Sequence, residues 1–222
     1  CKDLNIASAS GSTPNSTLGK VDLTTFTLNV TGKLRNYYEA IGNVPGTNQP
    51  NGFSTYPFTG TSGKISIVGN SRALTLVGEW GAIIGNNGAA GIFPLEINLN
   101  PNQTATLNTA IKTSDIKVIS GTLDAQTYTV SVDLSTTGFG DIFIATNAVL
   151  ISSANSSNVF QASGTRRAGT LTIIGTLILT GSSPQISMNS ILFNGTVQYA
   201  SVGDHSFEIS VNSGGSPTFY PT

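Results

Sequence analysis

The side chains that most often carry out catalysis are scarce in this chain. It has one His, one Cys and one Trp among 222 residues, and 9% of its residues are charged, against about 25% in a typical soluble domain. A Ser-His-Asp triad would need His205, which follows Asp204, but no Gly-x-Ser-x-Gly sequence is present to hold a nucleophile. Asp and His are also common in turns, so we interpret this pair as part of a turn before the last strand.

A pair of carboxyl groups is the other arrangement that could do chemistry. Glycoside hydrolysis needs two of them at a suitable separation, and the candidates are Glu39, Glu79, Glu96 and Glu208. Glu79 is the first choice, because the neighbouring Trp80 could raise its pKa and stack on a sugar ring. A strand that ends in a Gly-rich turn explains the sequence GEWG equally well, and we favour that interpretation. We therefore predict no catalytic residues and no enzyme.

Four aspartates recur along the middle of the chain, at Asp115, Asp124, Asp133 and Asp141. Regularly spaced carboxylates could supply the oxygen ligands that calcium prefers. The spacing also equals one strand plus one turn, and the chain contains no CxxC, HxxxH or EF-hand pattern. We predict that these aspartates lie in turns and at strand ends, with no metal and no cofactor.

Residues that favour strands surround these few charges. Phe26, Leu28 and Val30 alternate with polar residues, which is typical of a half-buried strand. Similar strands are expected at 64–68, 72–78, 92–99, 104–111, 115–120, 127–134, 141–151, 169–180, 185–193, 195–201 and 206–212. The run 169–180 alternates little, which suits a central strand buried on both faces or a strand that crosses between sheets.

No segment keeps a helical period, and no repeat of fixed length is found. We predict an all-β fold with almost no helix, an Ig-like or jelly-roll-type β-sandwich of about 11–12 strands. Residues 20–222 would form this single domain, and residues 1–19 a polar N-terminal leader.

The net charge of −1 comes without a basic stripe, which argues against nucleic acid as a partner. No apolar run reaches the length of a membrane-spanning helix. The chain begins with Cys1, as expected of an exported protein whose signal peptide has been removed, and we predict an extracellular or cell-surface location. Cys1 is where a bacterial lipoprotein would carry its lipid; the other interpretation is a processing boundary or an unpaired thiol.

Surface modification and contact sites can also be proposed from the sequence. Asn-x-Ser/Thr sequons that could carry glycans occur at Asn15, Asn29, Asn102, Asn155 and Asn194. Aromatic residues of the long irregular segment 35–63, among them Tyr37, Tyr38, Tyr56 and Phe58, could form a contact loop for protein or glycan, or a lid over the fold.

Sheet edges suggest what such a protein does. Unpaired edge strands attract other strands unless charges or prolines protect them, and this chain has few charges. In the leader, Leu4 and Ile6 alternate with polar residues, as in a strand that could complete the sheet of a neighbouring copy. Repeated head to tail, this contact gives an open filament.

With this polar leader and its Ser-, Thr- and Asn-rich, charge-poor composition, the chain resembles extracellular pilin-like subunits that polymerise by donor-strand exchange. These include chaperone-usher pilins and archaeal thread-type filament proteins. The single Cys excludes the internal disulfide that many chaperone-usher pilins carry, which favours the archaeal type. The resemblance implies a structural filament subunit for adhesion or biofilm, with copies of itself as partners. The alternative is a surface lipoprotein, anchored at Cys1, whose β-sandwich binds glycans or proteins of neighbouring cells.

Overall fold

A computed structural model gives the arrangement of the chain. It describes residues 4–6, 21–24, 26–31, 34–36, 58–60, 64–76, 82–84, 90–92, 94–108, 110–113, 115–133, 140–155, 160–163, 169–188, 190–200, 208–211 and 217–219. All regular structure in these residues is β-strand, and they contain no helix. The all-β prediction is therefore confirmed for the described part of the chain.

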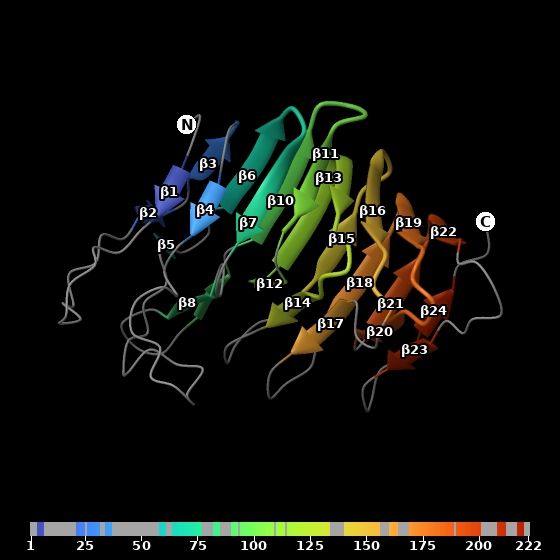
Figure 1. Cartoon of the computed structure of the whole chain (residues 1–222). Helices are drawn as coiled ribbons and strands as arrows, with labels where there is room; N and C mark the ends of the chain where they lie inside the picture. Colours follow the sequence, from blue (N-terminus) through green and yellow to red (C-terminus); the bar gives the residue numbers. More distant parts are fainter. Residues whose placement is uncertain are drawn as a thin grey trace, which may run out of the picture.

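Most of the strands belong to three faces of one molecule (Figure 1). Face 1 contains β3 (Thr27–Val30), β6 (Lys64–Gly69), β10 (Pro94–Leu99), the first half of β13 (Asp115–Asp124), β15 (Ile142–Ile144), β18 (Thr170–Ile173), β21 (Ser190–Phe193) and β24 (Pro217–Phe219). Face 2 contains β1 (Leu4–Ile6), β4 (Leu34–Asn36), β7 (Arg72–Leu76), β11 (Thr104–Leu107), the second half of β13, β16 (Ala148–Ser152), β19 (Thr176–Leu179) and β22 (Thr196–Tyr199). Face 3 contains β12 (Ile111–Thr113), β14 (Val130–Asp133), β17 (Phe160–Ser163), β20 (Gln185–Met188) and β23 (Glu208–Val211).

Two further strand pairs lie outside the faces. β2 (Val21–Thr24) pairs in parallel with β5 (Phe58–Gly60). β8 (Ala82–Ile84) pairs with β9 (Ala90–Ile92), which is the only antiparallel pair among the described strands.

Within each face, neighbouring strands are parallel and come from successive passes of the chain. The register pairs β10 with β13, β13 with β15 and β15 with β18 on face 1. After each strand of face 1 the chain turns onto face 2, and from β11 onward it passes through face 3 before it returns to face 1 one strand further along. This path is a parallel β-solenoid, or β-helix, in which each complete pass is one coil.

The predicted sandwich is therefore wrong. Ig-like and jelly-roll sandwiches are built from antiparallel strands, whereas the faces of this molecule contain parallel pairs throughout the described residues. Within the three faces, the connections between successive strands turn a corner from one face to the next, so that strands adjacent in the sequence do not become neighbours in a sheet.

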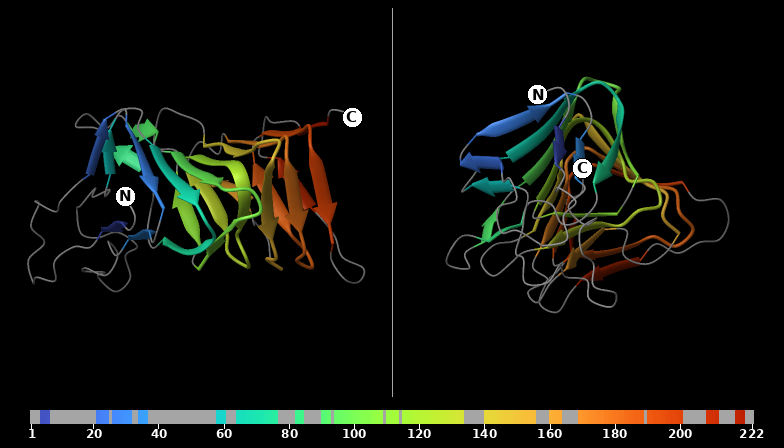
Figure 2. Two further views of the ribbon diagram at one scale, coloured as in Figure 1. Left: turned by 90° about the horizontal axis from the view of Figure 1, so that it is seen from above. Right: turned by 60° about the vertical axis from the view of Figure 1, so that its left-hand side comes forward.

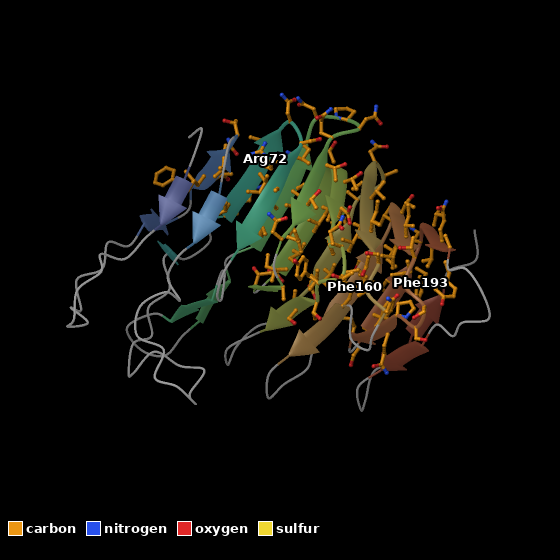
Figure 3. All side chains as sticks on the ribbon, viewed as in Figure 1. Arg72, Phe160 and Phe193 are labelled. Atoms are coloured by element: carbon orange, nitrogen blue, oxygen red, sulfur yellow. The ribbon has the colours of Figure 1, made fainter. Side chains whose placement is uncertain are left out.

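The core fills the inside of the coils. Side chains alternate between inside and outside along each strand, and register stacks the inward ones in columns. On face 1 one such column is Ile65, Leu95, Ile116, Ile142, Leu171 and Ile191, all buried. Phe160, the largest fully buried side chain, lies in a face 3 column between Val130 and Ile186 (Figure 3). The two views of Figure 2 show the strands succeeding one another along the molecule, with the faces wrapped around this core.

The coils of the solenoid differ in the number of residues that they contain. Successive coils are separated by 26 residues between Asp115 and Asp141, 29 between Asp141 and Thr170, and 30 between Ser66 and Glu96. The extra residues are accommodated between strands, so the columns of buried residues stay in register.

Gly175 lies at the corner between β18 and β19, where two coils approach closely. A Cβ atom added there would overlap the carbonyl oxygens of Ala145 and Ala148 in the preceding coil. Only glycine fits this corner, because main chain from two coils meets there.

Candidate functional site

Titratable side chains gather on the outer surface of face 1, where several of its strands begin. The register pairs Ser66 with Glu96, and Glu96 with Lys117. Asp115 lies two residues before Lys117 on β13, and Lys64 two residues before Ser66 on β6, so each pair shares one side of its strand. We define the face 1 cluster as Lys64, Glu96, Asp115, Lys117 and Asp141.

Asp115 and Asp141 link three successive coils. Asp115 Oδ1 accepts a hydrogen bond from the main-chain N–H of Asp141 at 2.8 Å. Asp141 Oδ1 in turn accepts one from the main-chain N–H of Thr170 at 2.9 Å. Each carboxylate therefore holds the residue at the start of the next strand of face 1.

Burial changes the acidity of both groups. Asp115 is 8% exposed, and loss of hydration raises its pKa from 3.8 to about 6. The hydrogen bond from Asp141 and the charge of Lys117 oppose this rise, while the charge of Asp141 adds to it. Burial raises the pKa of Asp141 as well, against the hydrogen bond from Thr170 and the charge of Lys117.

Glu96 forms the other half of the face 1 cluster. Its carboxylate accepts hydrogen bonds from Lys64 Nζ at 2.5 Å and from Ser66 Oγ at 3.0 Å. Glu96 is only 7% exposed although it points away from the core. A buried carboxylate needs such partners, because an unpaired charge out of water is costly.

These contacts give the face 1 cluster a structural role. The contacts of Asp115 and Asp141 are to main-chain amides of the next coil, and those of Glu96 are to side chains of β6. Of the carboxyl groups considered for hydrolysis, only Glu96 has a described side chain. Glu208 begins β23 on face 3, and Glu39, Glu79 and Trp80 lie outside the described residues, as do Asp204 and His205.

The four regularly spaced aspartates are divided among different parts of the solenoid. Asp115 and Asp141 are neighbours on face 1. Asp124 ends β13 on face 2, where its Oδ1 accepts the Gln126 main-chain N–H at 2.9 Å. Asp133 ends β14 on face 3. No group of three or more His, Cys, Asp or Glu side chains that could hold a metal occurs in the described part of the chain.

The two ends of the solenoid have a different character from its sides. Among the described residues, the large hydrophobic side chains that are exposed are Phe26 at 70% and Tyr199 at 37%. Phe26 precedes β3, the first strand of face 1, and Tyr199 ends β22, the last strand of face 2. We call these the β3 end and the β22 end; Figure 1 shows them at opposite extremes of the molecule.

Both ends present strands with one partner. Within the described residues β3 pairs only with β6, and β22 only with β19. Along β22 the amides of Thr196 and Ala200 donate to Gly175 and Leu179 of the preceding coil. Because main-chain groups alternate in direction along a strand, the amide of Val197 points toward the open edge.

Four of the predicted sequons have described positions, and all four are exposed. Asn29 lies on β3, Asn102 in the turn between β10 and β11, Asn155 after β16, and Asn194 between β21 and β22. The Asn155 side chain already accepts a hydrogen bond from the Ser182 main-chain N–H at 3.0 Å. Asn15 lies outside the described residues.

The predicted donor strand has a partner in its own chain. Leu4 and Ile6 form β1, whose register pairs Leu4 with Leu34 and Ile6 with Asn36 of β4. Phe58 begins β5, while Cys1, Tyr37, Tyr38 and Tyr56 lie outside the described residues.

Sequence reasoning missed the face 1 cluster as a unit. Its signal is the recurrence of Asp directly before an apolar strand, in DIKV at 115–118 and DIFI at 141–144. If the two segments are assigned to equivalent positions in successive coils, the Asp115 and Asp141 carboxylates are placed side by side.

No described residues form a helix with the length and apolar character required to span a bilayer. In comparisons with known proteins, no family model, no curated protein and no solved structure matches the chain.

Proposed function

We propose that this chain is a structural subunit of an extracellular filament in which β-solenoids stack head to tail, the β22 end of one copy on the β3 end of the next. The observation that carries the proposal is the exposure of Phe26 and Tyr199 at opposite ends of the solenoid. The adhesive and biofilm roles expected of such filaments belong to the same proposal.

Strand polarity supports this mode of stacking. All neighbouring strands of the three faces are parallel, so a second copy in the same orientation would continue each face without a reversal. The two ends differ from each other, so the contact would be heterologous. Copies stacked in one orientation along the solenoid axis do not return to the first copy, so the contact would not close into a ring. Stacking of this kind produces a filament rather than a dimer.

Two of the end strands lack the usual protection against pairing: β3 reads TLNV and β22 reads TVQY, with no charged residue or proline in either. The last strands of the other two faces do carry such residues, Glu208 in β23 and Pro217 in β24. Tyr199 occupies the next position in a column that runs through Ser152 and the buried Leu179. A further coil would cover this column.

This assembly differs from donation of the N-terminal strand. β1 already pairs with β4 of its own chain, and it keeps that pairing in the proposed contact, where its other edge would meet β22 of the neighbouring copy on face 2 while β3 meets β24 on face 1. A low content of charge on the subunit suits an assembly in which copies approach closely along their axes.

Sedimentation velocity over a wide concentration range, with electron microscopy of the same samples, tests the proposal. We expect the native chain to form rods that lengthen with concentration. Phe26→Lys and Tyr199→Lys should each stop growth, because a charge at an end opposes close contact with the next copy. Gln198→Lys is the matched control: the same charge on the same strand, but on an outward-facing position of face 2, should leave growth intact.

Dispersed monomers of the native chain at every concentration would overturn the proposal. Equal growth of the native, Phe26→Lys and Tyr199→Lys proteins would also overturn it, because association would then not use the ends. Thermal unfolding of each variant shows that the comparison is made on folded protein.

A further inference from the structure

The face 1 cluster contains two carboxylates whose environment makes them sensitive to pH. Asp115 and Asp141 stand on neighbouring coils, and each holds a main-chain amide of the following coil. The contacts lie at the entry to β15 and β18, so they fix the places where two separate passes of the chain return to face 1.

The surroundings of the two carboxylates are uneven in charge. Lys117, two residues after Asp115, is an exposed cation that acts on both carboxylates. On the other side, the register places Pro94 opposite Asp115. Glu96 of the neighbouring strand is already matched by Lys64, so Lys117 is the cation that acts on the buried Asp115 and the half-buried Asp141.

A proton relieves this imbalance without breaking the contacts. A protonated carboxyl group keeps a carbonyl oxygen that can accept the Asp141 amide. Protonation of Asp115 removes the repulsion between two neighbouring carboxylates and the cost of keeping a charge out of water. The solvent supplies the proton, and no bond of the chain changes.

We propose that Asp115 and Asp141 form a proton-controlled clamp that fastens three successive coils at the start of face 1 and tightens as the pH falls. The clamp is independent of the proposed filament, because it lies within one chain and away from both ends. It would make the solenoid firmest under acidic conditions outside the cell.

Hydrogen exchange at two amides measures the clamp directly. After correction for the intrinsic pH dependence of exchange, the amide of Asp141 should be about tenfold better protected at pH 5 than at pH 7.5, as follows from an Asp115 carboxyl pKa of about 6 when closed and 3.8 when open. The Thr170 amide, which Asp141 holds, should change in the same direction, because burial raises the pKa of Asp141 as well. The Gln126 amide is the internal control: it is held by Asp124 within the same coil, and its protection should change less.

Substitutions separate the proton from the hydrogen bond. Asp115→Asn keeps an oxygen that can accept the Asp141 amide and removes the charge, so protection of that amide should become almost independent of pH. Lys117→Gln removes the nearby cation, and carbon-detected NMR should then show the Asp115 carboxyl titrating at higher pH than in the native protein. A purely structural role of Asp115 would leave the pH dependence of protection at the Asp141 amide unchanged in Asp115→Asn.

Two results would overturn the clamp. The first is an Asp115 carboxyl of the native protein that titrates at or below pH 4. The second is equal protection of the Asp141 and Thr170 amides at both pH values. Both measurements use the native chain, so they remain decisive if a variant fails to fold.

Discussion

The guanidinium of Arg72 donates a hydrogen bond through Nη1 to the main-chain carbonyl of Val30, 2.9 Å away and 42 residues earlier in the sequence. The same guanidinium reaches the carbonyls of Val68 and Asn70 at the corner between β6 and β7. Figure 3 labels Arg72 in this region. One side chain thus ties the last residue of β3 to the next coil.

Replacing this guanidinium should loosen the β3 end. Burial lowers the pKa of Arg72 below its ordinary value, yet the group stays charged, and hydrogen bonds from a charged donor each contribute about 1.5–3 kcal/mol. We expect Arg72→Lys to lower the free energy of unfolding by about 1–2 kcal/mol, because an ammonium group cannot reproduce the planar fork of donors. Chemical denaturation measures this, and an unchanged midpoint with the Lys variant would contradict the assigned role.

The ion pair of Lys64 and Glu96 should respond unequally to loss of either partner. Lys64→Met leaves the Glu96 carboxylate buried beside Ser66 without its cation, which should cost about 1–3 kcal/mol. Glu96→Gln keeps an acceptor for Ser66 and leaves Lys64 free to reach water, so it should cost less. Chemical denaturation of both single variants and of the double variant gives the interaction free energy between the two side chains. A larger loss in the free energy of unfolding for Glu96→Gln than for Lys64→Met would contradict this account.

Glycine corners make a sharp test of coil stacking. Gly175→Ala should destabilise the fold by about 2–4 kcal/mol, because its Cβ would overlap main-chain oxygens that cannot move independently. Gly69→Ala is the comparison: Gly69 has a positive φ of 92°, but its nearest neighbour to an added Cβ is the Arg72 guanidinium at 3.6 Å. That variant should lose only about 1–2 kcal/mol from backbone strain. Equal losses would mean that crowding at Gly175 is not the cause.

The dependence of stability on pH follows from Asp115. Its pKa is raised from 3.8 to about 6 on folding, so folding favours the protonated form. The stabilisation is fully present below pH 3.8, is lost as the pH rises through about 6, and amounts to about 2 kcal/mol between pH 4 and pH 7. Asp141, whose pKa is also raised, acts in the same direction.

The free energy of unfolding at pH 4 and pH 7, compared between the native protein and Asp115→Asn, isolates this effect. We expect the free energy of unfolding of Asp115→Asn to exceed that of the native protein at pH 7 and to equal it near pH 4. The same difference between the two proteins at both pH values would rule out the assigned shift.

Local sequence pattern was a good guide to the strands. The predicted strands at 64–68 and 115–120 match β6 and the face 1 part of β13. In the first predicted strand Val30 is buried and Leu28 packs against the core, but Phe26 is exposed at the β3 end. An edge position, which depends on where the stack stops, is not visible in a strand's own residues.

The local sequence pattern did not show which strands pair with each other. The run 169–180 is two strands, β18 and β19, which bend at Gly175 onto different faces, so its inward residues alternate within each strand. Of the two interpretations offered for this run, burial on both faces is wrong, and a strand that crosses between sheets is closer to the observed bend between two faces. Parallel and antiparallel partners bury the same kinds of side chain, and coils of unequal length leave no fixed period, so neither the pairing nor the Asp115–Asp141 contact could be read from spacing.

Each coil contains a long segment of chain but adds little to the length of the solenoid along its axis, so the extended chain is much longer than the folded molecule. A folded coil adds only about 4.8 Å along the axis, the spacing between paired strands. The coil from Asp115 to Asp141 contains 26 residues, which span roughly 90 Å when fully extended. Under tension, a rod of such coils would unroll from an end one coil at a time, each step lengthening the rod and dissipating mechanical work while the remaining coils stay folded.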